Sequence, residues 1–134
     1  MNPYQRYKNE SVENMCSGEL LVMLYDGAIK DLKKAQIALE EEDYTFYDDR
    51  LDHLNAIIRY LMQTLDVTQP ISKDLLRLYS YITFDIGRCK AGRKRRKDEL
   101  QGMIDILQPL RDGFEEASRK VVDNHIPFDR SRSV

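Results

Sequence analysis

Apolar residues recur at steps of three and four positions along four long stretches of the chain, which are separated by short polar or proline-containing breaks. This spacing is typical of amphipathic helices and predicts helices over residues 18–41, 44–65, from 72 through Cys89, and 97–122. Ser17 precedes the first helix as a candidate N-cap, and the second helix follows Asp43. The apolar stripes comprise Leu21, Leu24, Ala28, Leu32, Ala35 and Leu39; Tyr47, Leu51, Leu54, Ile58, Leu61 and Leu65; Leu75, Leu78, Ile82, Ile86 and Cys89; and Leu100, Met103, Leu107, Leu110, Phe114, Ala117 and Val121.

Short connections between long helices bring sequence neighbours together in opposite directions. The predicted fold is therefore all-α, an antiparallel up-down-up-down four-helix bundle with an N-terminal arm. The 134 residues are the size of one domain, so we expect a single domain over 1–134. Residues 1–16 are expected to form the arm, and residues 123–134 a flexible tail.

Two charged segments of opposite sign occur in the first and third connections. Residues 40–52 carry seven acidic side chains, and residues 88–97 carry seven basic and no acidic ones. The first and third connections of such a bundle lie at the same end. We therefore expect the two segments to face one another.

Overall composition excludes several classes of protein. A formal net charge of −2 and a sequence pI near 5.7 disfavour a dedicated nucleic-acid binder. No run of apolar residues approaches membrane-spanning length, and the first 17 residues lack the apolar core of a signal peptide. Two cysteines, Cys16 and Cys89, are compatible with free thiols in a reducing compartment. These features predict a cytoplasmic protein with no membrane partner.

The sequence offers little for catalysis. His53 and His125 do not stand in the Glu-x-x-His spacing of di-metal carboxylate bundles, and the two cysteines and two histidines show no paired zinc spacing. Phosphate-binding glycine motifs and nucleophile elbows are absent. We therefore expect no enzyme activity, no cofactor and no metal site.

The first and third helices carry more apolar and aromatic residues than one core-facing stripe requires. The surplus residues are Leu20, Val22, Met23, Tyr25 and Ile29 in the first helix and Leu76, Tyr79, Tyr81 and Phe84 in the third. Wider core packing, the chain's own N-terminal arm, with Tyr4, Tyr7 and Val12, or an amphipathic partner segment could cover them. The pattern alone leaves these alternatives open.

Several short strings, in order along nearly the whole chain, resemble the flagellar secretion chaperone family FliS. They are Asn2-Pro3-Tyr4-Gln5-Arg6-Tyr7, Leu24-Tyr25-Asp26-Gly27-Ala28-Ile29-Lys30, Leu61-Met62-Gln63-Thr64-Leu65-Asp66, Ile71-Ser72-Lys73-Asp74-Leu75, Leu78-Tyr79-Ser80-Tyr81-Ile82 and Leu110-Arg111-Asp112-Gly113-Phe114. Ser80 stands where the family commonly has Asp, and Asp85 and Cys89-Lys90 also depart from the family pattern.

This resemblance implies a cytoplasmic, non-enzymatic export chaperone that binds the disordered C-terminal segment of flagellin and prevents its premature assembly. It also implies an N-terminal arm that lies over part of the bundle and moves when flagellin binds. The residues that the resemblance assigns to partner binding are Tyr4 and Tyr7 in the arm and Tyr25, Ile29, Tyr79, Tyr81 and Ile82 in a groove. We further expect Asp26 and Lys30 to lie at the rim of this groove and to set the register of the client.

Other interpretations remain. Tyr25 and Tyr79 would serve either as binding anchors or as core tyrosines with satisfied hydroxyls. For a chaperone, other flagellar export proteins are further candidate partners. An alternative function for the whole chain is that of a structural bundle that homodimerises through its surplus apolar face. A third alternative is a phosphate or nucleic-acid contact through residues 88–97, although no aromatic residue interleaves the basic ones to stack on bases.

Overall fold

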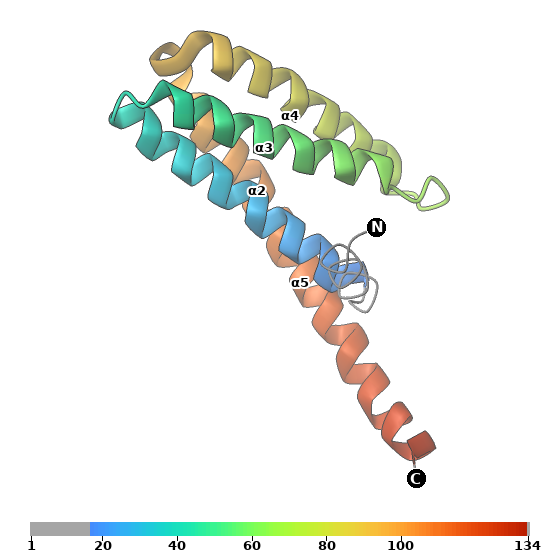
Figure 1. Ribbon diagram of the computed structural model, residues 1–134. Helices are drawn as coiled ribbons and strands as arrows, with labels where there is room; N and C mark the ends of the chain where they lie inside the picture. The colour runs from blue at the N-terminus through green and yellow to red at the C-terminus, as the bar shows by residue number, and fades with distance from the viewer. Residues whose placement is uncertain (1–16, 134) are drawn as a thin grey trace, which may run out of the picture.

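The computed structural model describes residues 17–133, with side chains from 18 to 120. All regular secondary structure in this part of the chain is helical, as predicted. Its elements are α2 (Ser17–Glu40), α3 (Tyr44–Gln63), α4 (Ser72–Gly92), the 3₁₀ helix η1 (Arg93–Arg96) and α5 (Lys97–Ser133). Consecutive long helices run in opposite directions (Figure 1). The expected arm, residues 1–16, lies outside the described residues.

The described helices share one hydrophobic core, but they do not enclose it evenly. Helix α2 packs extensively against both α3 and α5, and α4 packs against α3. In contrast, α4 and α5 share few contacts, because α5 diverges from α4 after the η1 corner and runs beyond the other helices (Figure 1). The side between α4 and α5 is therefore the least closed side of the bundle.

Helix α5 is longer than the sequence pattern indicates. Its apolar stripe ends at Val121, but the helix continues to Ser133 and is 37 residues long. The expectation of a flexible tail over residues 123–134 stays a prediction.

The connection between α2 and α3 follows its sequence signals. Glu42, in the left-handed region with φ of 58°, reverses the chain after α2. Asp43 then caps α3, because its Oδ1 accepts a hydrogen bond from the Phe46 backbone N–H at 3.1 Å.

Asp43→Ala removes this cap and is expected to lower the free energy of unfolding by ~1 kcal/mol, because the Phe46 N–H loses its side-chain acceptor. Urea denaturation measures this change. Asp43→Asn retains an acceptor oxygen and is the matched control. Equal stability of the alanine variant and the wild type would show that the cap contributes nothing.

The acidic and basic segments face one another, as predicted from the topology. Lys90 Nζ lies 2.7 Å from Asp52 Oδ1, and Lys94 Nζ lies 2.5 Å from Glu42 Oε1. The Lys94 ammonium lowers the pKa of Glu42 below its usual range. The Arg93 guanidinium also stacks over the Tyr44 ring, with its Cζ 4.1 Å from the ring centroid. These partners give much of the basic segment a structural role at this end of the bundle.

Helices α2 and α3 are also joined by a buried charge. Asp31 is 3% exposed and accepts hydrogen bonds from Arg50 Nη1 at 3.1 Å and from His53 Nδ1 at 2.5 Å. A buried carboxylate requires such partners to offset its desolvation. This cluster fixes the register of the two helices.

None of the described helices is long and apolar enough to cross a membrane.

Candidate functional site

The side of the bundle between α4 and α5 carries partly open apolar residues. We call Leu78, Tyr81, Ile106 and Leu110 the α4–α5 face. Tyr81 is 50% exposed, and the other three are partly buried against the edge of the core.

Helical spacing places these four residues along one seam. Asp85 in α4 lies beside Glu99 in α5 near the η1 corner. Leu78 and Tyr81 precede Asp85 by seven and four residues, and Ile106 and Leu110 follow Glu99 by seven and eleven. These spacings keep residues on one side of a helix. Because the two helices are antiparallel, the four apolar side chains extend from the corner in the same direction.

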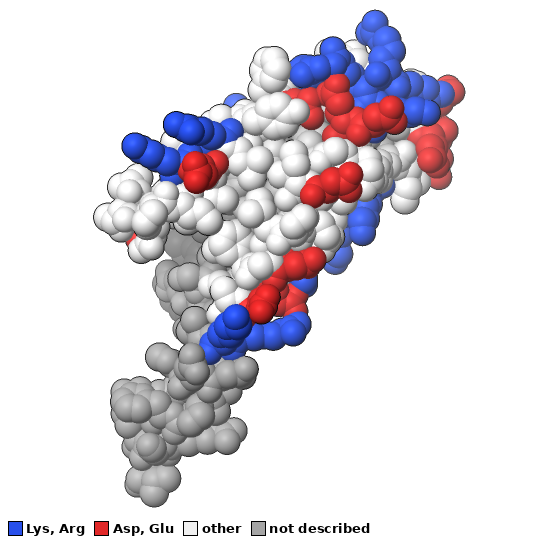
Figure 2. Space-filling model, turned by 180° about the vertical axis from the view of Figure 1, so that it is seen from behind, with Lys and Arg blue, Asp and Glu red and all other residues white. Residues whose placement is uncertain are grey.

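The surface around this seam is poor in charge. Figure 2 views the molecule from behind, on the side where α5 lies, and shows a broad uncharged area between separate clusters of charged residues. An uncharged strip beside two diverging helices suits an apolar segment of a partner.

Beneath this region, Tyr25 and Tyr79 form a buried pair. Their hydroxyl oxygens are 2.5 Å apart, and the Tyr25 ring centroid lies 5.5 Å from that of Phe114. Burial raises the pKa of both tyrosines above the usual value, and the mutual hydrogen bond raises that of Tyr25 further while lowering that of Tyr79. Both hydroxyls are satisfied within the protein, which is the core arrangement considered among the sequence alternatives.

The expectation that Tyr25, Ile29, Tyr79 and Ile82 line an open groove is corrected by their burial. Their exposed fractions are 0%, 5%, 1% and 0%, respectively, so their side chains form core rather than open surface. The reason is that α2 packs against both α3 and α5 and therefore buries a broader stripe than one heptad face, while Tyr79 and Ile82 lie on the core side of α4.

The remaining residues assigned to partner binding lie elsewhere. Tyr81 is half exposed on the α4–α5 face, and Lys30 is exposed on α2. Asp26 is at the surface, where its Oδ1 accepts a hydrogen bond from Arg111 Nε at 2.8 Å and joins α2 to α5. Tyr4 and Tyr7 lie outside the described residues. A contact between a partner and any of these residues remains a prediction.

A depression lies between α2 and the start of α5. Its volume is about 730 Å³. Leu39 and Leu100 lie in its wall together with Lys33, Lys94 and Lys97. Gln36 Nε2 donates a hydrogen bond to Gln101 Oε1 at 3.0 Å within it. This depression is more charged than the α4–α5 face and is therefore less suited to an apolar partner.

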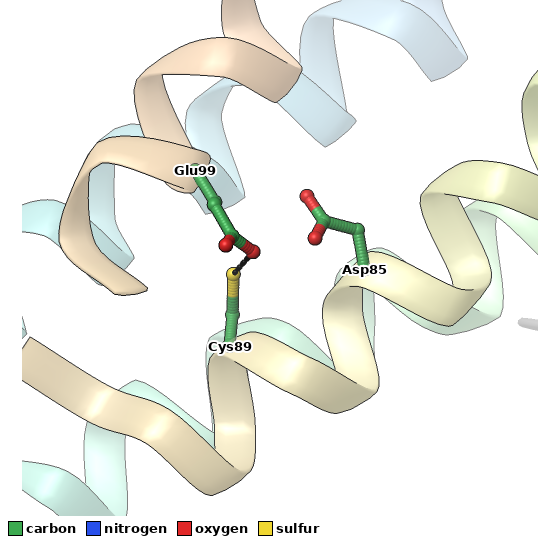
Figure 3. A group of neighbouring side chains, drawn as sticks. All are labelled: Asp85, Cys89 and Glu99. Carbon is green, nitrogen blue, oxygen red and sulfur yellow. Dashed lines mark hydrogen bonds between the residues drawn. The ribbon is translucent and has the colours of Figure 1, made fainter. Parts of the chain in front are cut away.

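Sequence reasoning did not find a third feature, a cluster of Asp85, Cys89 and Glu99 near the η1 corner (Figure 3). Burial raises the pKa of Asp85 to about 6 and that of the Cys89 thiol to about 12, and the neighbouring acids add to both shifts. The pKa of Glu99 is lowered, because Asp85 and Arg96 provide hydrogen bonds to it. The spacing of Asp85 and Cys89 was a signal that they share a helix face, but nothing in the sequence placed Glu99 beside them.

Comparison with known proteins decides the family. The sequence model described as "Flagellar protein FliS" matches residues 1–121. The chain belongs to the FliS family. A curated relative, the flagellar secretion chaperone FliS of Bacillus subtilis (strain 168), is 33% identical over 81 residues, which are 60% of this chain and 61% of the relative. The aligned part therefore spans about three fifths of that relative.

A solved structure agrees with the fold of this FliS-family chain. The crystal structure described as a flagellar chaperone from bacteria superposes with a TM-score of 0.72 at 24% identity, and the match covers 87% of this chain and 95% of the other. This likeness supports the helical fold.

Proposed function

We propose that the protein is a cytoplasmic flagellar export chaperone that binds the disordered C-terminal segment of flagellin and prevents its premature polymerisation. Membership of the FliS family supports an export role. The observation that carries a client-binding role is the α4–α5 face, where two diverging helices leave apolar residues partly open on an uncharged surface (Figure 2).

The physical argument concerns the client's disorder. A disordered segment loses conformational entropy when it binds, so its affinity has to come from extended apolar burial at roughly 25 cal/mol per Å². The face runs lengthwise along two helices and suits such an extended contact. Tyr81 offers a large, stiff and half-exposed side chain. Leu78, Ile106 and Leu110 extend the apolar strip on either side.

Isothermal titration of the full chain with a peptide of the flagellin C-terminal segment tests this proposal. We expect saturable binding of one peptide per chain with a negative change in heat capacity, because apolar surface is buried. A scrambled peptide of the same composition is the control. Absence of binding heat at several temperatures, with the helical content of the protein intact, would contradict the proposal.

The alternative function, a homodimerising bundle with no flagellar client, uses the same apolar surface differently. Size-exclusion chromatography with light scattering separates the two functions. A chaperone is expected to form a peptide complex, whereas the alternative predicts a stable dimer that the flagellin peptide neither binds nor dissociates.

A further inference from the structure

Three side chains of the types that can bind metals converge where α4 meets α5 (Figure 3). Asp85 and Cys89 are four residues apart on one face of α4, and Glu99 reaches them from the first turns of α5. One ligand atom from each lies within 4.8 Å of the others, and Cys89 Sγ lies 3.8 Å from Glu99 Oε2. Two carboxylates and a thiol are thus gathered from two helices that share few other contacts.

One oxygen of the buried Asp85 carboxylate has no hydrogen-bond donor in this cluster. Asp85 is 2% exposed, and its Oδ1 has no hydrogen bond. The Arg88 Nη1 atom is 3.9 Å from that oxygen, which is too long for a hydrogen bond. Figure 3 shows the carboxylate directed toward Glu99. A buried carboxylate without a donor is costly, so a cation or a proton is required between these groups.

The two neighbouring arginines do not supply that cation at the centre. Arg88 Nη2 and Arg96 Nη1 contact the same oxygen of Glu99, Oε1, at 3.2 and 2.6 Å. The other oxygen, Oε2, is left on the side of Cys89. In metal sites, a carboxylate that binds the ion also accepts hydrogen bonds from neighbouring side chains, which hold it in position. The two arginines can hold Glu99 in this way through Oε1.

We propose that Asp85, Cys89 and Glu99 bind one divalent transition-metal ion of the zinc class. The sulfur ligand favours zinc over magnesium or calcium, which prefer ligand sets made only of oxygen. Three protein ligands leave a fourth tetrahedral position for water. Binding releases the thiol proton to solvent, and the ion then joins sulfur and two carboxylate oxygens. The Glu99 side chain is 26% exposed, which gives the ion a route into the cluster. The ion would clamp α4 to α5 at the corner from which the two helices diverge.

Titration of the full chain with Co²⁺ as a spectroscopic probe for zinc tests this site. The titration uses the Cys16→Ser variant as the parent chain, because Cys89 is then the one remaining thiol of the two in the sequence. We expect one Co²⁺ per chain, with a thiolate-to-cobalt charge-transfer band and visible bands of tetrahedral intensity, and we expect Zn²⁺ to displace it. Cys89→Ser should abolish the charge-transfer band. Glu99→Gln and Asp85→Asn should each weaken binding at least ~10-fold.

The matched control is Asp52→Asn, which removes a carboxylate that contacts Lys90 at the same end of the bundle but lies outside the cluster. It should leave the spectrum and the affinity unchanged. Absence of the charge-transfer band in the parent chain would show that the cluster holds only a proton and would overturn the proposal. Equal affinity of the Glu99→Gln variant and the parent, with far-ultraviolet circular dichroism confirming both folds, would overturn it as well.

Discussion

Tyr79→Ala is expected to lower the free energy of unfolding by ~3–5 kcal/mol, as truncation of large core residues does. The Tyr79 side chain is 1% exposed and fills the core next to Tyr25, and its hydroxyl forms the 2.5 Å contact with the Tyr25 hydroxyl. The alanine variant therefore leaves both a cavity and a buried hydroxyl that has lost its partner. Chemical denaturation followed by circular dichroism measures the loss.

Tyr81→Ala is the matched control for this prediction. Tyr81 lies two residues further along α4 and is 50% exposed, so its truncation should change stability by less than ~1 kcal/mol. Tyr79→Phe separates the cavity from the hydroxyl, because it keeps the ring and removes only the hydrogen bond. Similar stabilities of the Tyr79→Ala and Tyr81→Ala variants would show that Tyr79 is not a core residue.

Tyr81→Asp is expected to weaken binding of the flagellin C-terminal peptide by ~2–4 kcal/mol, or roughly 30- to 1000-fold. The substitution removes the large aromatic contact at the middle of the α4–α5 face. It also places a charge where the client would bury apolar surface, and that charge would have no partner. Isothermal titration calorimetry of the folded variant measures the change.

Leu76→Asp provides a sharp control for this binding prediction. Leu76 is on the same helix and is 45% exposed, close to the exposure of Tyr81, but the five-residue spacing puts it on a different side of α4 from Tyr81. The substitution adds the same charge to the same helix away from the α4–α5 face, so binding should stay within ~3-fold of the wild type. Equal weakening by Tyr81→Asp and Leu76→Asp would place the client elsewhere.

The helices could be predicted from the sequence because their apolar spacing and capping residues are local signals. The facing charged segments followed from topology alone. The side of α4 that faces the core could not be predicted from the sequence. Leu75, Leu78 and Ile82 satisfy steps of three and four, but so do Leu75, Tyr79 and Ile82, and the protein buries the second set. Choosing between such sets requires the positions of α2 and α3.

The same limit explains the candidate sites. Tyr25 was counted as surplus because one stripe already accounted for α2, whereas in the fold its ring packs beside Tyr79 and Phe114. The cluster with Asp85 depends on the path of the η1 corner, where Arg93 adopts a φ of 51° and brings Glu99 back toward α4. Helical periodicity describes each helix separately and contains no information about such a turn.

The central claim is that the α4–α5 face receives the client, and photo-crosslinking tests it most directly. Flagellin C-terminal peptides with a benzophenone group at successive apolar positions would be bound to the full chain, irradiated and mapped by mass spectrometry. The predicted crosslinks fall within residues 78–82 of α4 and 103–110 of α5. Crosslinks confined to the depression around Lys33 and Lys97, or to the side of α4 around Leu76, would contradict the claim.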